Sequence, residues 1–412
     1  MFGDLASPPR LSGALPLPPD QVTGPSPGVF FTVLSSPRSV MQEEVQEGHS
    51  APQSKSPHPG VSVHYKPDSV LDPAPSIVLV GCGGIARHHL QAYLDAGLSV
   101  VGLVDPNEEA GEKMRSQFFP DAQVFSDHRA ALDALDAAIF DVATHPIPRV
   151  AIIRDCLQEK RHVLSQKPFV INLDVGEELC QLADKQGVHL VVNQNGRWAP
   201  HFSYLRAATA AGLLGQTFAV RMTCDWDHTW VEGTAFEHIR ELILYDYAIH
   251  WFDIVRCLLP NSRATRVYAA SGRAPEQTIM PNLLGQVLIE FDNAQATMSF
   301  DAMVKYGSEE RTYVAGTRGT AVSNGSGNQD QHVTLTTGDG VYRPSLEGRW
   351  FPDGFRGTMC ELISAIREHR PSQIAAADNL RSLALCFAAI HSARSGQPVT
   401  PGEIRQLPPD AA

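Results

Sequence analysis

The chain has 412 residues, too long for one compact domain; at about 100–200 residues per domain it predicts two or three. Hydrophobic residues make up 43% of it, which excludes wholesale disorder because sizeable cores can form. The 45 acidic residues outnumber the 33 basic ones, and a formal net charge of −12 disfavours nucleic acid and anionic membrane as partners. No apolar run approaches the roughly 18–20 residues that span a bilayer, so we expect a soluble protein.

The first 75 residues differ from the rest in composition. Nearly half of the 30 prolines fall there, and each proline fixes its own φ and lacks a backbone donor. We therefore predict a disordered proline-rich tail over residues 1–75. The start does not resemble a secretion signal or a transit peptide. A misassigned start, with Met41 as the true one, and a proline-rich ligand segment are both open explanations of the tail.

Seven cysteines are scattered along the chain without a C-x-x-C pair. Their odd number and spacing indicate neither a disulfide framework nor a metal site, so we expect a cytoplasmic protein without a bound metal.

Strand and helix patterns alternate over residues 76–195. Short apolar runs, typical of strands buried on both faces, are separated by segments with helical spacing. Such alternation predicts a parallel sheet with right-handed crossovers. The expected strands are 77–80, 100–104, 138–144, 162–165 and 189–193, and the expected helices are 85–96, one from about 149 and one from about 173.

Past about residue 213 the apolar pattern changes to a period of two, which predicts antiparallel strands. A turn at Asp292-Asn293 joins two of them as a hairpin. We place a second domain at residues 196–405. Its expected strands are 216–224, 264–271, 284–291, 295–300 and 333–337, and its expected helices are 240–259, 357–369 and 379–394.

A glycine-rich turn follows the first predicted strand and matches G-x-G-x-x-G/A. Asp105 stands 19 residues after its last position, at the end of the second strand. Such a turn lets backbone N–H groups approach a pyrophosphate, and the carboxylate accepts hydrogen bonds from the ribose hydroxyls. A carboxylate there repels a 2′-phosphate, so NAD is favoured over NADP. The expected cofactor contacts in the turn are Gly81, Gly83, Gly84, Ile85 and Ala86.

Two further segments carry candidate chemistry. Lys167 stands in a Q-K-P segment just past a later strand of the parallel sheet, at the edge where such sheets bind ligands. In the long apolar helix, Asp246 and His250 are four residues apart and therefore share one face. Taken singly, these residues are better explained as a solvated surface lysine and a structural hydrogen bond.

In combination these motifs resemble the glucose–fructose oxidoreductase / inositol dehydrogenase family, from about residue 76 to the C-terminal region. The resemblance implies an α/β protein with an N-terminal Rossmann domain and a C-terminal α/β domain built on an open, mostly antiparallel sheet. It also implies a dehydrogenase that oxidises a sugar, inositol or polyol hydroxyl, or reduces the ketone, with NAD(P).

The same resemblance implies roles for individual residues. His250 corresponds to the general base, Lys167 to the group that holds the reacting oxygen, and Asp246 to the residue that orients the imidazole. Thr144 and Gln166 correspond to cofactor contacts. A histidine that titrates near neutrality and a neighbouring ammonium suit proton transfer from an alcohol in any case.

The chain departs from the family pattern at three places. His145 stands between Thr144 and Pro146, where the family usually has Thr-Pro. Gln166 replaces the usual glutamate before Lys-Pro, which puts the hold on the nicotinamide ribose in question. Arg149 stands where the family has a histidine after the Thr144 loop, which we expect to alter local cofactor contacts only.

The substrate pocket is less well defined by sequence. Arg197 follows the last parallel strand and Trp230 follows the first antiparallel one, and we expect both near the substrate. An NAD-requiring glycosidase and a non-catalytic NAD- or sugar-sensing regulator share the family fold and stay open as alternatives. An open sheet with an apolar outer face predicts a homodimer or homotetramer.

Overall fold

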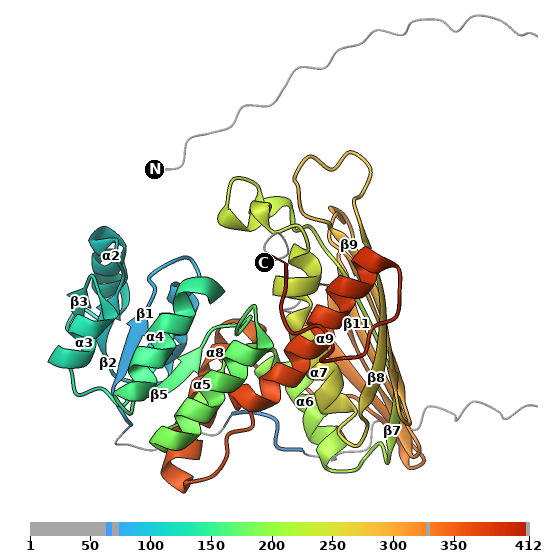
Figure 1. Cartoon of the computed structure of the whole chain (residues 1–412). Coiled ribbons are helices and arrows are strands. Elements are labelled where there is room, and N and C mark those ends of the chain that lie inside the picture. Colours follow the sequence, from blue (N-terminus) through green and yellow to red (C-terminus); the bar gives the residue numbers. More distant parts are fainter. Residues whose placement is uncertain (1–62, 68–73, 327–329, 409–412) are drawn as a thin grey trace, which may run out of the picture. The chain divides into compact units, whose positions relative to one another are not determined.

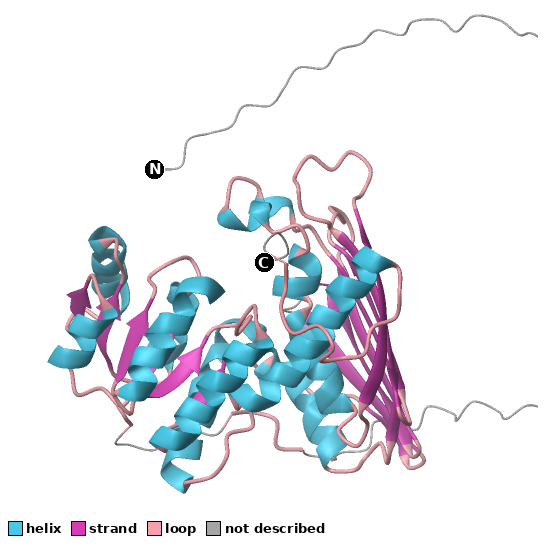
Figure 2. Ribbon diagram, in the orientation of Figure 1, coloured by secondary structure: helices cyan, strands magenta, loops and turns pink. Residues whose placement is uncertain are grey.

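A computed structural model describes residues 63–67, 74–326 and 330–408, in which two sheets are flanked by helices (Figures 1 and 2). The first sheet is parallel and the second is mostly antiparallel, so the predicted fold class is confirmed. Most of the predicted tail lies outside the described residues. Within the described stretch 63–67, the carbonyl of Tyr65 accepts a hydrogen bond from the Ser203 hydroxyl (2.5 Å) and its hydroxyl accepts one from the Glu347 N–H (2.9 Å).

The first sheet has six parallel strands in the order β3-β2-β1-β4-β5-β6. β1 and β4 are buried at every position because helices cover both faces, which explains the unbroken apolar run of β1; β4 carries one buried polar residue, Asp141. The order of the strands along the sheet reverses between β1 and β4. Open α/β sheets bind ligands at such a point, outside the carboxyl ends of the strands. The strands are β1 (Ile77–Val80), β2 (Val100–Val104), β3 (Gln123–Phe125), β4 (Ile139–Val142), β5 (His162–Ser165) and β6 (Leu190–Val192).

Five helices connect these strands. Asn107, Asp127 and Asn172 cap three of them by accepting hydrogen bonds from first-turn N–H groups. The helices are α1 (Ala86–Asp95), α2 (Glu108–Phe118), α3 (His128–Ala134), α4 (Pro146–Gln158) and α5 (Leu173–Gln186).

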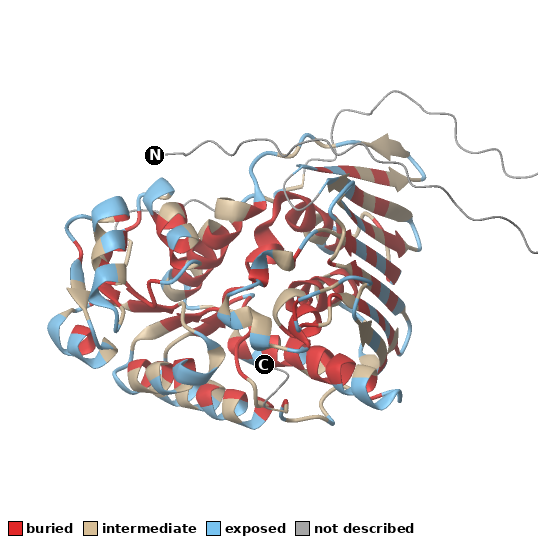
Figure 3. Cartoon of the chain, turned by 90° about the horizontal axis from the view of Figure 1, so that it is seen from above, coloured by how far each residue is buried: buried red, intermediate tan, exposed pale blue. Residues whose placement is uncertain are grey.

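The second sheet has eight strands in the order β14-β13-β12-β11-β7-β10-β9-β8. The turn at Asp292-Asn293 joins β9 and β10 as an antiparallel hairpin, as predicted, whereas β7 and β10 pair in parallel. Burial alternates along the strands because helices cover one face of the sheet (Figure 3). The strands are β7 (Thr217–Asp225), β8 (Ala264–Gly272), β9 (Leu284–Phe291), β10 (Gln295–Asp301), β11 (Glu309–Gly316), β12 (Gly319–Ser326), β13 (Asp330–Thr337) and β14 (Gly340–Tyr342).

Helices α6 (Pro200–Ala210), α7 (Ile249–Leu258) and α9 (Ala376–Ser395) pack on this second sheet (Figure 1). Helix α8 (Trp350–Glu368) instead packs against α1 and shares a core with β1. A C-terminal segment therefore completes the covering of the first sheet. The domain boundary at residue 195 stays a prediction. The sequence analysis did not predict that a helix near the C-terminus would pack on the first domain.

The sequence prediction was incomplete in three respects. Helices α2, α3 and α6 were missed. Strands β3, β11, β12 and β14 were missed, because β3 and β14 have only three residues each and polar positions interrupt the alternation in β11 and β12. The helix expected over 240–259 is not continuous: a π-helical turn, η4 (Ile243–Tyr247), precedes α7. That turn changes the candidate site.

Candidate active site

The glycine turn lies at the carboxyl end of β1 and requires glycine at its first position. Gly81 has φ +99°, and a Cβ there would lie 3.0 Å from Cγ2 of Thr144 and 3.1 Å from the carbonyl carbon of Ala143. A Cβ on Gly83 or Gly84 would meet no heavy atom within 4 Å, so the backbone is open to a ligand at these positions. The turn therefore fits the pyrophosphate of a dinucleotide.

Asp105 is held beside this turn by two backbone N–H groups. Its Oδ2 accepts a hydrogen bond from Cys82 N and its Oδ1 accepts one from Asn107 N, each at 2.8 Å. The start of α1 is not capped by a side chain. The glycine turn and Asp105 are thus brought together at one edge of the sheet.

Lys167 follows β5 and reaches across to the second half of the molecule. Its Nζ donates to the backbone carbonyl of Asp246 at 2.9 Å and lies 3.1 Å from the Asp246 carboxylate oxygen Oδ2. The Lys167 and Asp246 side chains are 15% and 20% exposed, so the pair is shielded but reachable. The amine is therefore fixed by two acceptors at the ligand-binding edge of the parallel sheet.

Asp246 lies in the π-helical turn η4, and this places it differently from the sequence expectation. Asp246 was expected to orient the imidazole of His250; its carboxylate contacts Lys167, and Nδ1 of His250 has no hydrogen-bond partner among the described residues. The expectation assumed the rotation of an α-helix between the two residues. A π turn changes that rotation, and such turns occur frequently at functional sites.

His250 is buried beside the same cluster. Its ring lies against Trp350, with ring centroids 5.3 Å apart, and a Cβ on Gly196 would come within 3.5 Å of its Nδ1. Burial, and then the positive charge of Lys167, hold the pKa of His250 well below its usual range. The imidazole is therefore neutral, and it is a weaker base than the sequence analysis expected of a histidine that titrates near neutrality.

His228 lies in the segment after β7 that sequence reasoning placed near the substrate, but that reasoning assigned this histidine no role of its own. Its Nδ1 accepts hydrogen bonds from the indole N–H groups of Trp226 (2.8 Å) and Trp230 (3.3 Å). Burial lowers the pKa of His228 to about 4, with Asp246 opposing and Lys167 adding to that shift. Since Nδ1 is an acceptor in a neutral ring, the proton resides on Nε2, which makes His228 a donor near Lys167.

Aromatic rings surround His228. Trp226 stacks on Tyr247 with ring centroids 3.9 Å apart, and Trp230, 59% exposed, contacts Phe236 at 6.0 Å. The ring of Phe236 in turn lies 5.8 Å from that of His145, the last residue of the loop between β4 and α4. Segment 226–238 therefore reaches from the second sheet to the cofactor edge. The predicted residue Trp230 belongs to this aromatic cluster.

A buried polar network lies behind the Q-K-P segment. Nδ1 of His89, in α1, lies 2.7 Å from Oδ2 of Asp141, which also accepts the Tyr93 hydroxyl at 2.6 Å. Its Nε2 lies 3.3 Å from the amide nitrogens of Gln166 and Asn193. The Gln166 side chain, 5% exposed, is thus directed into the protein interior.

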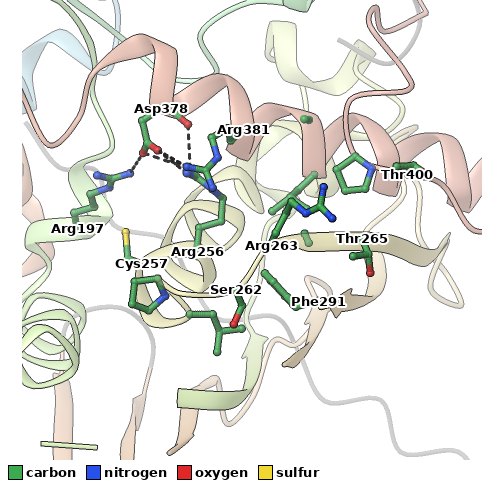
Figure 4. Close-up of a pocket in the computed structure, with 16 residues that line it drawn as sticks. Arg197, Arg256, Cys257, Ser262, Arg263, Thr265, Phe291, Asp378, Arg381 and Thr400 are labelled. Atoms are coloured by element: carbon green, nitrogen blue, oxygen red, sulfur yellow. Dashed lines mark hydrogen bonds and ion pairs between the residues drawn. The ribbon is translucent and has the colours of Figure 1, made fainter. Parts of the chain in front are cut away.

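Arg197 lines a separate cavity of about 610 Å³ between α7, α9 and the start of β8. Its guanidinium forms a two-point ion pair with Asp253, at 2.6 and 2.7 Å, and reaches Asp378 at 3.0 Å. Arg256 also pairs with Asp378, at 2.5 Å (Figure 4). Arg197 was expected near the substrate; the structure engages it with carboxylates, in a cavity whose lining does not include Lys167.

Two absences apply to the described part of the chain. No group of three or more His, Cys, Asp or Glu side chains is arranged to hold a metal ion in residues 63–67, 74–326 and 330–408. Within those same ranges, no helix combines the length and apolar character needed to cross a membrane.

The parallel sheet, the open glycine turn and the lysine at its edge define a dinucleotide-binding oxidoreductase. Comparison with known proteins agrees: residues 76–194 match the GFO/IDH/MocA oxidoreductase family with its NAD-binding Rossmann fold, and residues 202–322 match the C-terminal domain of that family. The chain belongs to the GFO/IDH/MocA family and is an NAD-binding oxidoreductase.

Individual relatives cover nearly the same part of the chain. A D-apiose dehydrogenase from Paraburkholderia graminis is 26% identical over 349 residues, which is 81% of this chain and 90% of that protein. An inositol 2-dehydrogenase from Rhizobium meliloti is 23% identical over 327 residues, 76% of this chain and 95% of that protein. The crystal structure of an Agrobacterium radiobacter oxidoreductase with NAD+, L-tartaric acid and magnesium is similar in fold, with a TM-score of 0.72 at 21% identity over 80% of this chain and 99% of that one.

Proposed function

We propose that the protein is an NAD-dependent dehydrogenase that oxidises a CH–OH group of a sugar, inositol or related polyol, or reduces the corresponding ketone. The observation that carries this proposal is the meeting of Lys167, from the first sheet, with Asp246 of the second half, beside the buried neutral His250. The names of the relatives, which include apiose and inositol dehydrogenases, support the substrate class.

Each residue has a distinct task in this proposal. Bound NAD+ supplies the hydride acceptor. Lys167 donates a hydrogen bond to the substrate oxygen and stabilises the negative charge that develops on it as the C–H bond breaks. His250 accepts the hydroxyl proton at a ring nitrogen. Loss of this proton and of the hydride converts the alcohol to the ketone. Asp246 positions Lys167 through its carboxylate and carbonyl.

The substrate side of the pocket fits a polyhydroxylated molecule. The faces of Trp226 and Trp230 offer apolar surface to the C–H groups of a sugar ring. His228, with its proton on Nε2, offers a hydrogen-bond donor to a second hydroxyl. An aromatic face next to fixed polar groups is typical of small-molecule sites that orient a ligand.

The test is turnover with purified protein. NAD+ and a panel of polyols and aldoses should produce NADH, and Lys167→Ala should lower kcat by at least about 100-fold, in the range for removal of one charge-stabilising donor. NAD affinity should stay unchanged, since Gly81 and Asp105 are intact. Lys185→Ala, on the exposed face of α5, is the matched control and should behave as wild type.

Three outcomes would contradict the proposal. Survival of activity in Lys167→Ala would refute the mechanism. Release of an aryl leaving group from glycosides without net NADH would indicate a glycosidase instead. NAD binding without turnover on either panel would indicate a regulator.

The proposal extends to assembly. Phe218 in β7 and Leu288 in β9, two strands separated by β10, are exposed hydrophobic residues of the second sheet, 44% and 39% exposed. A second copy packing on the outer face of that sheet would bury them, and we therefore propose a homodimer or homotetramer. Light scattering that gives a monomer at micromolar concentration would contradict this.

A further inference from the structure

Arg149 is a buried cation close to the candidate site, and no role has been assigned to it so far. It lies in the first turns of α4, after the loop that follows β4, and only 1% of it is exposed. The family has a histidine at this position of the sequence. We expected it to alter local cofactor contacts, yet the structure directs it to the protein backbone.

The guanidinium of Arg149 joins two loops at the ligand-binding edge. Nη2 donates to the carbonyl of Thr144, in the loop after β4. Nη1 donates to the carbonyl of Gln166 at 2.5 Å and to the carbonyl of Pro168. The residues on either side of Lys167 are therefore tied to one rigid group, and that group is tied to the Thr144 loop.

The chemistry of arginine suits these contacts. The guanidinium is planar and presents its donors in a fixed fork, so it can serve several carbonyls that point in different directions. Hydrogen bonds from a charged donor are stronger than those between neutral groups. Although burial lowers the pKa of Arg149 to about 10, the side chain stays protonated at neutral pH. An imidazole has two donors at most, and an ammonium has no planar fork.

The same side chain lies near the other half of the site. The negative charge of Asp246 acts on Arg149 and supports its protonation. Asp246 also accepts the hydrogen bonds from Lys167. Arg149 thus stabilises the backbone from which Lys167 extends. It acts on the side of that loop next to the Asp246 carboxylate, which binds the Lys167 amine.

We propose that Arg149 is a positioning residue for Lys167: by tying the carbonyls of Thr144, Gln166 and Pro168 together, it fixes the direction in which the lysine leaves the sheet edge. This inference rests on the proposed dehydrogenase function, in which Lys167 must meet the reacting oxygen. A misplacement of about 1 Å in a reacting group can cost roughly 100-fold in rate, so loss of this anchor should act mainly on kcat.

The kinetic test compares Arg149→Met with Arg154→Met, which removes an arginine from the same helix whose partner is the surface carboxylate of Glu178. In Arg149→Met, kcat should fall by about 100-fold, while NAD affinity and the far-UV spectrum stay near wild type. Arg149→Lys should recover only part of kcat, and Arg154→Met should match wild type. Wild-type kcat in a folded Arg149→Met protein would overturn the proposal.

A second readout does not depend on turnover. Reductive methylation followed by mass spectrometry measures how fast the Lys167 amine reacts, with Lys185 in the same chain as the internal reference. Lys167 should react faster in Arg149→Met and Arg149→Lys than in wild type. Its rate of reaction in Arg154→Met should equal that in wild type. If wild type turns over no substrate, faster labelling still supports the positioning role, and only the dehydrogenase proposal fails.

The lysine variant keeps the test decisive if Arg149→Met does not fold. Wild-type kcat together with wild-type labelling of Lys167 in Arg149→Lys would then overturn the proposal. Slower turnover with faster labelling would support it.

Discussion

Replacing His228 by asparagine should reduce the loss of stability that the apoprotein suffers in mild acid. Because the folded-state pKa of His228 is about 4 against an ordinary 6.5, the unfolded chain takes up a proton at this position first as the pH falls. Its contribution is therefore unfavourable below about pH 6.5 and grows until about pH 4. Between about pH 7.5 and pH 5, His228 alone should lower the free energy of unfolding by about 2 kcal/mol.

Asparagine suits this test because its Oδ1 can still accept the Trp226 indole N–H, whereas its side chain does not titrate. Urea unfolding of wild type and His228→Asn at both pH values gives the double difference, in which the other histidines cancel. His332→Asn, at an exposed position of β13, is the matched control and should lose stability with pH as wild type does. An identical pH dependence in wild type and His228→Asn would refute the assignment of a depressed pKa to His228.

Two further predictions concern the cofactor and the buried ion pair. Asp105→Ser should raise the activity with NADP relative to NAD, because it removes the negative charge that repels a 2′-phosphate; an unchanged ratio of kcat/KM for the two cofactors would contradict this. Asp253→Asn should lower the free energy of unfolding by about 3–5 kcal/mol, since it leaves the buried guanidinium of Arg197 with one charged partner fewer. Thermal and urea denaturation measure that change, and a variant with wild-type stability would show that the Arg197–Asp253 pair contributes no net stability.

Much of the fold followed from local pattern. The unbroken apolar run at 77–80 and the glycine turn after it depend only on neighbouring residues, and both appear in the structure as β1 and the turn at Gly81. The hairpin at Asp292-Asn293 was predictable for the same reason. Short strands such as β3 and the polar β12 carry little periodic signal of their own, because their pairing partners stabilise them.

The residues of the candidate site could be predicted from the sequence better than their contacts could. The sequence identified Lys167, Asp246 and His250, but it paired the aspartate with the histidine, and only the fold shows that the aspartate contacts the lysine. Whether residues 243–247 form an α or a π turn depends on how that segment packs against distant parts of the chain, and no local pattern encodes this.

The sequence by itself determined the class of fold, the nucleotide edge and the residue types available for chemistry, because these depend on short-range periodicity and spacing. The tertiary structure alone decided where each polar group found its partner. Arg197 pairs with Asp253 and Asp378, and Arg149 donates hydrogen bonds to backbone carbonyls. A buried charge must be compensated by the acceptors that the folded chain brings near it. Those acceptors come from segments far apart in the sequence, so their identity is a property of the fold.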